Sequence, residues 1–482
     1  MQVSNRLKNQ HLLWRAAFGP MAENAADLNN ISPGKLWEAL MKTSAKKPDK
    51  INVASGMGDG LVKGIQGLAQ MEKLTREQKK AMRQQSSEDI KSLNLRWMTE
   101  MINSEAQFRE KMSLFWHGHF ACRVINIFYQ QELLDIIRQN AFGKFGDLLR
   151  SVSMSPAILQ FLNNQQNKKQ RPNENFARVL MELFTLGRGN YTENDVKEAA
   201  RAFTGWGFNL QGEFIPRNHL HDNGSKTFLG KSGNFNGDDI IDIILQQKQT
   251  AIYITRKIVH YFVNEKANDK KVQELADRFS QSGYDIGKLM QDIFTSEWFY
   301  EEKNIGNKIK SPVELIVGIR RLLPLQLENE ADQLLLQRAL GQILFYPPNV
   351  AGWPGGKSWI DSSTLMLRLR IPQLITANED INIQAKSDDD TMMGQMRHER
   401  ASGQKQEFGK KLIAVVDWDT TAGIFKKIPR EDLLKIISET VLQSKGRVNN
   451  TLLIKYINNE SRNAFIQSAI INLMSTPEYQ LC

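Results

Sequence analysis

The stretch EDIKSLNLRWMTEMIN, residues 88–103, shows the pattern that recurs along most of this chain. Its large apolar residues stand three or four positions apart, at Ile90, Leu93, Trp97 and Met101. This spacing lines one face of an α-helix, because one helical turn holds about 3.6 residues. The stretch therefore predicts an amphipathic helix with one buried face.

Further helices are expected elsewhere in the chain. The same spacing marks helices near 108–116, 272–279 and 286–293. Ser311, Pro312 and Glu314 have the order of a helix cap, a first-turn proline and a capping-box glutamate, and Thr192 with Asp195 opens another helix similarly. Alternating β patterns are scarce, apart from a short hairpin expected around 207–216. The sequence predicts an all-α fold.

The domain organisation follows from length and composition. A chain of 482 residues can bury a large core without disulfides or metals. We expect a large multi-helix domain over residues 1–384 and a small C-terminal helical annex, residues 409–482, packed on it. The polar residues 385–408 are interpreted as a loosely structured linker, and the glycine-rich region at about 46–70 as a flexible loop.

Several classes of protein are disfavoured by what the sequence lacks. There is no apolar run of about 18 residues, so no membrane span is expected. The start shows no continuous hydrophobic stretch of signal-peptide type, so the expected location is the cytoplasm. The two cysteines, Cys122 and Cys482, form no metal motif, and a single disulfide between them stays open. Cys122 is interpreted as a core residue.

Positive charge is concentrated near the start of the chain. The net charge is +10, and the first hundred residues hold 16 Lys+Arg against 10 Asp+Glu, densest at 42–50 and 73–83. One interpretation is an anionic partner such as nucleic acid or a phosphorylated polymer, and the other is a solvated surface. Because aromatic residues do not alternate with these lysines, nucleic acid is not the expected partner.

Two His-x-His pairs provide candidate metal ligands. They are His117 with His119, and His219 with His221, which is followed by Asp222. Residues two apart on a helix point in nearly opposite directions, so a pair shares an ion only from a turn or extended segment. The glycine inside the first pair favours a turn, and imidazole with carboxylate suits zinc, iron or manganese. The structural alternative is that His117 caps its helix and His119 packs under aromatic rings.

The densest polar stretch is PNENFARVLMELF, residues 172–184. Glu174, Arg178 and Glu182 are spaced four apart and are expected on one face of a largely buried helix. A buried ladder of this kind indicates a metal-linked carboxylate or a rigid polar network, because unpaired buried charges are costly. The alternative is ordinary ion pairing on an exposed face. Arg201 repeats the theme in the following helix.

A loop rich in proline and glycine, PPNVAGWPGGKSW, covers residues 347–359. Its ending is similar to that of a phosphate-binding loop, but Ala351 stands where that motif requires a glycine, so nucleotide binding is rejected. Its two tryptophans either stack on a sugar or clasp a neighbouring helix, and the clasp is expected.

Together these segments, in this order, resemble the large bacterial family catalogued as domain of unknown function 1800. The resemblance covers nearly the whole chain and rests on HLLWRAAFG (11–19), FWHGHF (115–120), PNENFARVLMELFTLG (172–187), YTE (191–193), ARAFTGW (200–206), HDNGSK (221–226), LG (229–230), SPVE (311–314) and the loop 347–359. The family pattern does not clearly cover His219, and it usually has glutamate where Val179 stands.

The resemblance implies an all-α fold and brings no activity with it. Family members are often encoded beside an uncharacterised protein related to sulfatases and alkaline phosphatases, which implies a protein partner of that type. Many members also carry export signals, which are not seen in this chain.

Two functional hypotheses follow. In the first, the chain is a metal-assisted hydrolase with one polar pocket. Its divalent metal would be held by His117, His119, His221 and Asp222, and its catalytic groups would be Glu174, Glu182, Arg178 and Lys226, with Arg201 orienting carboxylates. In the second, the same residues form a structural network, and the chain is a non-catalytic helical binding or assembly partner of a sulfatase- or phosphatase-like protein.

Overall fold

The computed structural model describes residues 3–25, 27–54, 75–209, 211–266, 268–377, 380–382, 409–443, 448 and 450–482. Over these residues the chain is predominantly helical, with a few short strands, which confirms the all-α prediction. Residues 55–70 of the predicted flexible loop and the whole of the predicted linker, 385–408, lie outside the described residues.

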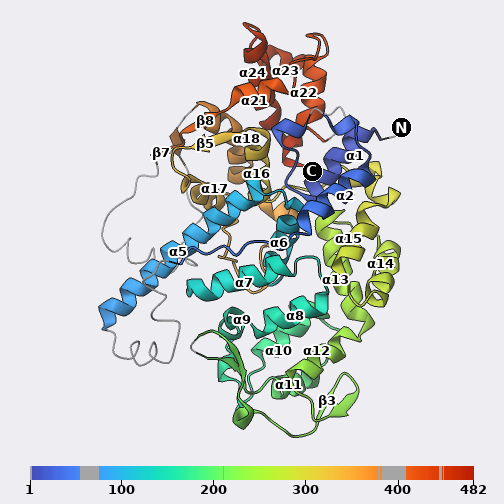
Figure 1. Ribbon diagram of the computed structural model, residues 1–482, viewed down its shortest axis with the longest axis vertical. Helices are drawn as coiled ribbons and strands as arrows, with labels where there is room; N and C mark the ends of the chain where they lie inside the picture. The colour runs from blue at the N-terminus through green and yellow to red at the C-terminus, as the bar shows by residue number, and fades with distance from the viewer. Residues whose placement is uncertain are drawn as a thin grey trace.

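The first three hundred residues build the central, lower and right-hand parts of the molecule in Figure 1. α8 to α12 lie at the bottom of that view and α13 to α15 along its right side. The helices of this part are α1 (Asn5–Ala16), α2 (Pro33–Ser44), α5 (Arg76–Asn103), α6 (Gln107–His119), α7 (Ile127–Gln139), α8 (Phe145–Met154), α9 (Pro156–Phe161), α10 (Asn175–Val179), α11 (Glu193–Ala202), α12 (Gly237–Leu245), α13 (Lys248–Phe262), α14 (Asp269–Gln281) and α15 (Ile286–Phe294).

The rest of the chain builds the upper part of the molecule, where the C-terminal helices are drawn in orange and red. Its helices are α16 (Pro312–Leu322), α17 (Asp332–Leu340), α18 (Ser362–Ala377), α21 (Trp418–Gly423), α22 (Leu433–Val441), α23 (Asn450–Leu453) and α24 (Arg462–Met474). Two antiparallel pairs join segments on either side of residues 383–408: β5 (Leu325–Leu327) with β8 (Ala414–Val416), and β6 (Asp380–Asn382) with β7 (Gly409–Lys411).

The remaining strands form two small hairpins. β1 (Trp206–Phe208) pairs with β2 (Phe214–Pro216), which confirms the hairpin expected around 207–216. β3 (Lys226–Phe228) pairs with β4 (Lys231–Gly233). Both hairpins lie beside α11 or its C-terminal end, so they place the residues that follow α11 close to that helix.

The predicted local signals form as expected. The helix predicted at 88–103 is the C-terminal part of α5. Ser311 and Glu314 form a capping box at the start of α16, and Thr192 and Asp195 do so at the start of α11, each side chain bonding the backbone N–H at the other position.

Two hydrophobic clusters make up the core. One is built mainly from α6 to α15, and the other from α5, α16 to α18 and the C-terminal helices. α1 and α6 belong to both, because neighbouring residues on each helix face different clusters: Leu13 and Met112 lie in the first, Trp14 and Leu114 in the second. Residues 409–482 share the second cluster with α5 and α16. The domain boundaries stay a prediction.

A buried carboxylate connects these clusters. Glu314 on α16 forms ion pairs with Lys111 of α6 and, at 2.8 Å, with Lys308, and its side chain is 1% exposed. Lys111 also donates to the carbonyl of Trp14 on α1 at 3.1 Å. Burial by itself raises the pKa of Glu314, but the two lysines outweigh it and hold that pKa well below its usual value. One ionised carboxylate therefore ties α1, α6 and α16 together.

The last residue described, Cys482, lies in the same interior. Arg15 of α1 is fully buried and donates to the carbonyl oxygens of Cys482 at 2.6 Å and Val263 at 3.1 Å. Cys482 and Cys122 are both buried free thiols, so the disulfide left open above does not form. Among the described residues no helix is long and apolar enough to cross a membrane.

We expect Glu314→Gln to lower the free energy of unfolding by about 3–5 kcal/mol, because it removes the carboxylate that both buried lysines, Lys111 and Lys308, bond. Urea unfolding followed by circular dichroism measures this. The matched control is Glu274→Gln, which removes an exposed partner of the exposed Lys271 and should cost less than about 1 kcal/mol. Equal effects of the two substitutions would contradict the role given to Glu314.

Candidate functional site

The first His-x-His pair lies on a helix. The sequence favoured a turn at Gly118, and this prediction is wrong, because α6 continues through His119. The helical hydrogen bonds extend to the Phe120 N–H, which donates to the Trp116 carbonyl. The two imidazoles therefore project in different directions and meet different parts of the protein.

His117 is a buried acceptor for the backbone. Its Nε2 accepts a hydrogen bond from the Phe345 N–H at 3.1 Å, so the ring proton is on Nδ1. Its ring contacts Phe345 and, at 5.5 Å between centroids, Trp353. Trp353, one of the two tryptophans of the Pro/Gly loop, thus contacts α6 as the sequence predicted. Burial lowers the pKa of His117 to about 3.

His119 has the opposite tautomer. Its Nε2 lies 3.1 Å from the Phe184 carbonyl, which can only accept, so the ring proton is on Nε2. Nδ1 then accepts from the amine of Lys257 at 3.3 Å. The ring packs against Trp116 and Phe120, which confirms the aromatic setting given as the structural alternative. Burial, followed by the charge of Lys257, holds the pKa of His119 well below its usual value.

A π-helical turn, Leu180–Thr185, follows α10 and exposes the carbonyl that His119 uses. The wider turn lets backbone carbonyls bond side chains: Tyr253 Oη donates to Leu183 at 3.0 Å, beside the His119 bond to Phe184. Gly187 ends it at φ +81°, where a Cβ would lie 2.7 Å from the Tyr253 ring. Burial lowers the pKa of Lys257, one turn from Tyr253 on α13, to about 8.

The π-turn also divides the predicted glutamate ladder. Arg178 pairs with Glu174 at 3.1 Å and with Glu193 of α11 at 2.7 Å, and these side chains are 36%, 39% and 69% exposed. Glu182 is turned away and instead bonds Arg188 at 2.7 Å and Tyr191 at 2.9 Å. These exposures favour the alternative of surface ion pairing over a buried ladder.

We call these six residues the polar face: Glu174, Arg178, Glu182, Arg188, Tyr191 and Glu193. Burial raises the pKa of Glu182, but the bonds from Arg188 and Tyr191 outweigh it, so the pKa lies below its usual value. The face is therefore a set of mutually paired charges rather than a group of free acids and bases.

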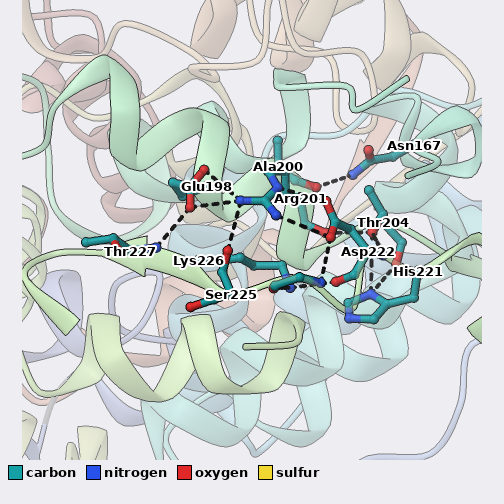
Figure 2. A network of polar contacts seen from close by, with 11 residues as sticks. Asn167, Glu198, Ala200, Arg201, Thr204, His221, Asp222, Ser225, Lys226 and Thr227 are labelled. Atoms are coloured by element: carbon teal, nitrogen blue, oxygen red, sulfur yellow. Dashed lines mark hydrogen bonds and ion pairs between the residues drawn. The ribbon is translucent and has the colours of Figure 1, made fainter. Parts of the chain in front are cut away.

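A second network is centred on Arg201 at the end of α11 (Figure 2). Its guanidinium bonds Asp222 at 2.8 Å, Glu198 at 3.0 Å and the Ser225 carbonyl at 3.2 Å. Asp222 thereby has a lowered pKa, chiefly because of the hydrogen bond from Arg201. Arg201 thus orients the carboxylates of Asp222 and Glu198, which is the role that the sequence predicted for it.

Lys226 supports the loop beneath this network. It is 1% exposed, and its amine donates to the carbonyls of Asp222 at 2.6 Å and Gly224 at 3.0 Å. Burial lowers its pKa, and Asp222 partly offsets this. Since its amine is directed at backbone carbonyls, it fixes the shape of the loop and does not face solvent.

His221 differs from His117 and His119 in keeping the lone pair of one ring nitrogen without a partner among the described residues. Its Nδ1 lies 2.9 Å from the Thr204 carbonyl, so the proton is on Nδ1. In the described part of the chain nothing hydrogen-bonds its Nε2, which keeps a free lone pair. His219 is exposed on a short 3₁₀ turn, Asn218–Leu220, and takes no part in the network.

The predicted site residues thus fall into separate groups. His117 belongs to the Pro/Gly loop contact, His119 to the π-turn, and His221 with Asp222 to the Arg201 network. α11 connects the polar face to that network, because Glu193 stands at its start and Arg201 at its end. No group of three or more His, Cys, Asp or Glu that could hold a metal occurs among the described residues.

Sequence reasoning missed Thr204 and Lys257. The Thr204 hydroxyl donates to the Arg201 carbonyl at 2.5 Å and accepts from the Asp222 N–H at 2.8 Å. Its place in the quoted segment ARAFTGW was the available signal. Lys257 stands between Ile254 and Ile258, both fully buried, and a lone lysine in such an apolar spacing indicates a specific partner.

His117 should make the fold sensitive to acid. Its pKa is about 3 when folded and about 6.5 when unfolded, so below pH ~6.5 the unfolded chain binds a proton that the folded chain does not. Stability then falls by about 1.4 kcal/mol per pH unit as the pH drops from ~6.5 toward 3. Denaturant unfolding across this range should show a shallower pH slope for His117→Gln. An unchanged slope refutes the assignment.

Thr204→Val should lower the free energy of unfolding by about 1–2 kcal/mol, because it leaves the partly buried Asp222 N–H without its acceptor. Amide hydrogen exchange at Asp222 should also become faster. Thr227→Val, at an exposed position of β3, is the control and should change stability by less than about 0.5 kcal/mol. Unchanged exchange at Asp222 would show that the hydroxyl does not hold this loop.

Comparison with known proteins gives a family and nothing finer. The model of the family described as protein of unknown function (DUF1800) matches residues 11–481, nearly the whole chain. No curated protein and no solved structure matches the chain. The motifs around His117, the π-turn and the Arg201 network all lie within the matched region. The chain belongs to the DUF1800 family of proteins of unknown function.

Proposed function

We propose that this chain is a non-catalytic helical binding or assembly partner of another protein. The observation that carries the proposal is that, apart from His221, the residues expected to do chemistry already have partners within the protein. His117 and His119 use the nitrogen lone pairs that a metal would need, and the carboxylates of Glu182 and Asp222 are held by arginines. Hydrolysis requires a free base or an ion with an open position.

The polar face is the surface that suits a protein partner best. Arg188 is 86% exposed and Glu193 69%, yet both are held in place by ion pairs. Arginine and tyrosine are enriched at protein interfaces, where they give large contact areas with directed hydrogen bonds. A partner of the sulfatase- or alkaline-phosphatase-like type, which family resemblance implies, is the proposed occupant.

Arg188→Glu should weaken binding to a sulfatase- or phosphatase-like protein of the type often encoded beside family members by at least about fivefold. Isothermal titration calorimetry with the two purified proteins measures this. Arg278→Glu, an exposed paired arginine on α14, is the matched control and should leave the affinity unchanged. Absence of any complex, or equal losses for the two variants, contradicts the proposal.

Metal analysis tests the same proposal independently. The purified chain should hold well under one equivalent of zinc, iron or manganese, and a chelator should not change its melting temperature. Stoichiometric metal that is lost in His221→Ala, with the fold intact by circular dichroism, would overturn the proposal.

One observation favours a second candidate, a hydrolase that uses His221 as a general base. A ring with Nδ1–H fixed by a carbonyl and Nε2 free has the orientation of catalytic imidazoles. Hydrolysis of p-nitrophenyl phosphate, sulfate and acetate would test it. An activity that falls by about a hundredfold or more in His221→Gln would favour the hydrolase, and no activity in either protein would reject it.

A further inference from the structure

A cavity of about 650 Å³ lies between the segment that follows α2 and the junction of α5 with α6. This volume is in the range of ligand-binding pockets. The segment is residues 46–53, seen in Figure 1 as the dark-blue trace that leaves α2 and runs toward α5. We call this cavity the lysine groove, because Lys46, Lys47 and Lys50 lie along one wall.

The wall of the lysine groove is held rigidly. The Arg138 guanidinium donates to the Asp49 carbonyl at 2.7 Å, and the Gln131 side chain bonds both Asn52 at 3.1 Å and the Val53 N–H at 3.3 Å. Proline at position 48 restricts Lys47 to an extended backbone. Lys47 and Lys50 are therefore displayed on a preformed extended segment, which Lys46 precedes in a bend after α2, and a ligand does not have to order it.

The charges of the groove leave the lysines available. Glu110 in the floor is matched by Arg138, which bonds it at 2.6 Å, and Glu100 lies 3.5 Å from Arg96. Lys46, Lys47 and Lys50 are exposed, and in the described part of the chain none of them lies within ion-pair distance of a carboxylate. The carboxylates left in the lining are Asp49 and Glu105, so the three lysines exceed them by one. Lys50 also lies near Glu132, where burial raises the pKa of the carboxyl and the charge of Lys50 partly offsets this.

We propose that the lysine groove binds an extended acidic segment of the protein partner, through carboxylates placed against Lys46, Lys47 and Lys50. The backbones of Lys47 and Lys50 are roughly 10 Å apart on the extended segment, which favours a ligand with several separated charges over one small anion. Carboxylates three positions apart on an extended peptide are also roughly 10 Å apart and therefore match the spacing of Lys47 and Lys50. The proposal rests on the proposed binding function.

Nucleic acid fits this groove less well. The lining residues include no aromatic side chain on which a base could stack. The polar lining and the modest excess of positive charge suit discrete carboxylates better than a continuous phosphate backbone, which favours a dense run of cations.

Fluorescence anisotropy with a fluorescein-labelled oligoglutamate peptide tests the groove on the purified full chain. Changing Lys46, Lys47 and Lys50 together to glutamine should raise the Kd at least about tenfold. The control changes three exposed lysines elsewhere, Lys426, Lys427 and Lys435, to glutamine and should leave Kd within about twofold. All six lysines are exposed, so both variants should fold, which their melting temperatures check.

The proposal is overturned if the peptide does not bind, if both triple variants lose affinity equally, or if oligouridylate binds the groove more tightly than oligoglutamate. It is also overturned if inorganic phosphate displaces the labelled peptide at the same concentration as unlabelled oligoglutamate does. Because the peptide assay contains no partner protein, it tests the groove separately from the proposed binding function. Peptide binding without any complex with the partner protein would support the groove as an acidic-segment site and reject that protein as the source of the segment.

Discussion

The ionised carboxylate of Glu314, shared by Lys111 and Lys308 inside the protein, is the contact on which the arrangement of helices depends most. It lies where the two hydrophobic clusters meet, and through Lys111 it fixes α6 against both α1 and α16. An unpaired charge at this depth would be strongly destabilising, so the three helices keep one relative position. His117 and His119 lie on α6 about two turns beyond Lys111, and their positions follow from that constraint.

This placement decides what the imidazoles can do. The fixed end of α6 presents His117 to the Phe345 N–H and His119 to the π-turn, so each ring is part of the packing between segments. The carboxylates are arranged similarly, since Arg178, Arg188 and Arg201 each hold one or two of them. The resulting surface is charged and its groups are paired with one another, which is why we propose recognition of another protein rather than hydrolysis. The lysine groove lies at the N-terminal end of α6, whereas the two histidines lie at its C-terminal end. We propose this groove as the place where an acidic segment binds.

Much of the fold could be predicted because its signals are local. The capping boxes of Ser311 and Thr192 and the hairpin that starts at Trp206 depend on residues within a few positions of one another. The site could be predicted only in part. Glu182 does not share the helix face of Glu174 and Arg178, because the π-turn intervenes. The carbonyls of this turn are bonded by Tyr253 and His119 from distant helices. The lysine groove depends on Gln131 and Arg138 holding a segment some eighty residues earlier. Such pairings leave no periodic trace in the sequence.

The central claim, that the histidines of α6 are structural and already engaged, is tested most directly by nitrogen NMR of imidazole-labelled protein, titrated with acid and with zinc. The account predicts that His117 carries its proton on Nδ1 and His119 on Nε2, that both stay neutral well below pH ~6.5, and that zinc moves neither signal. Protonation of either ring near pH ~6.5, or a stoichiometric zinc-dependent shift of both, would contradict it.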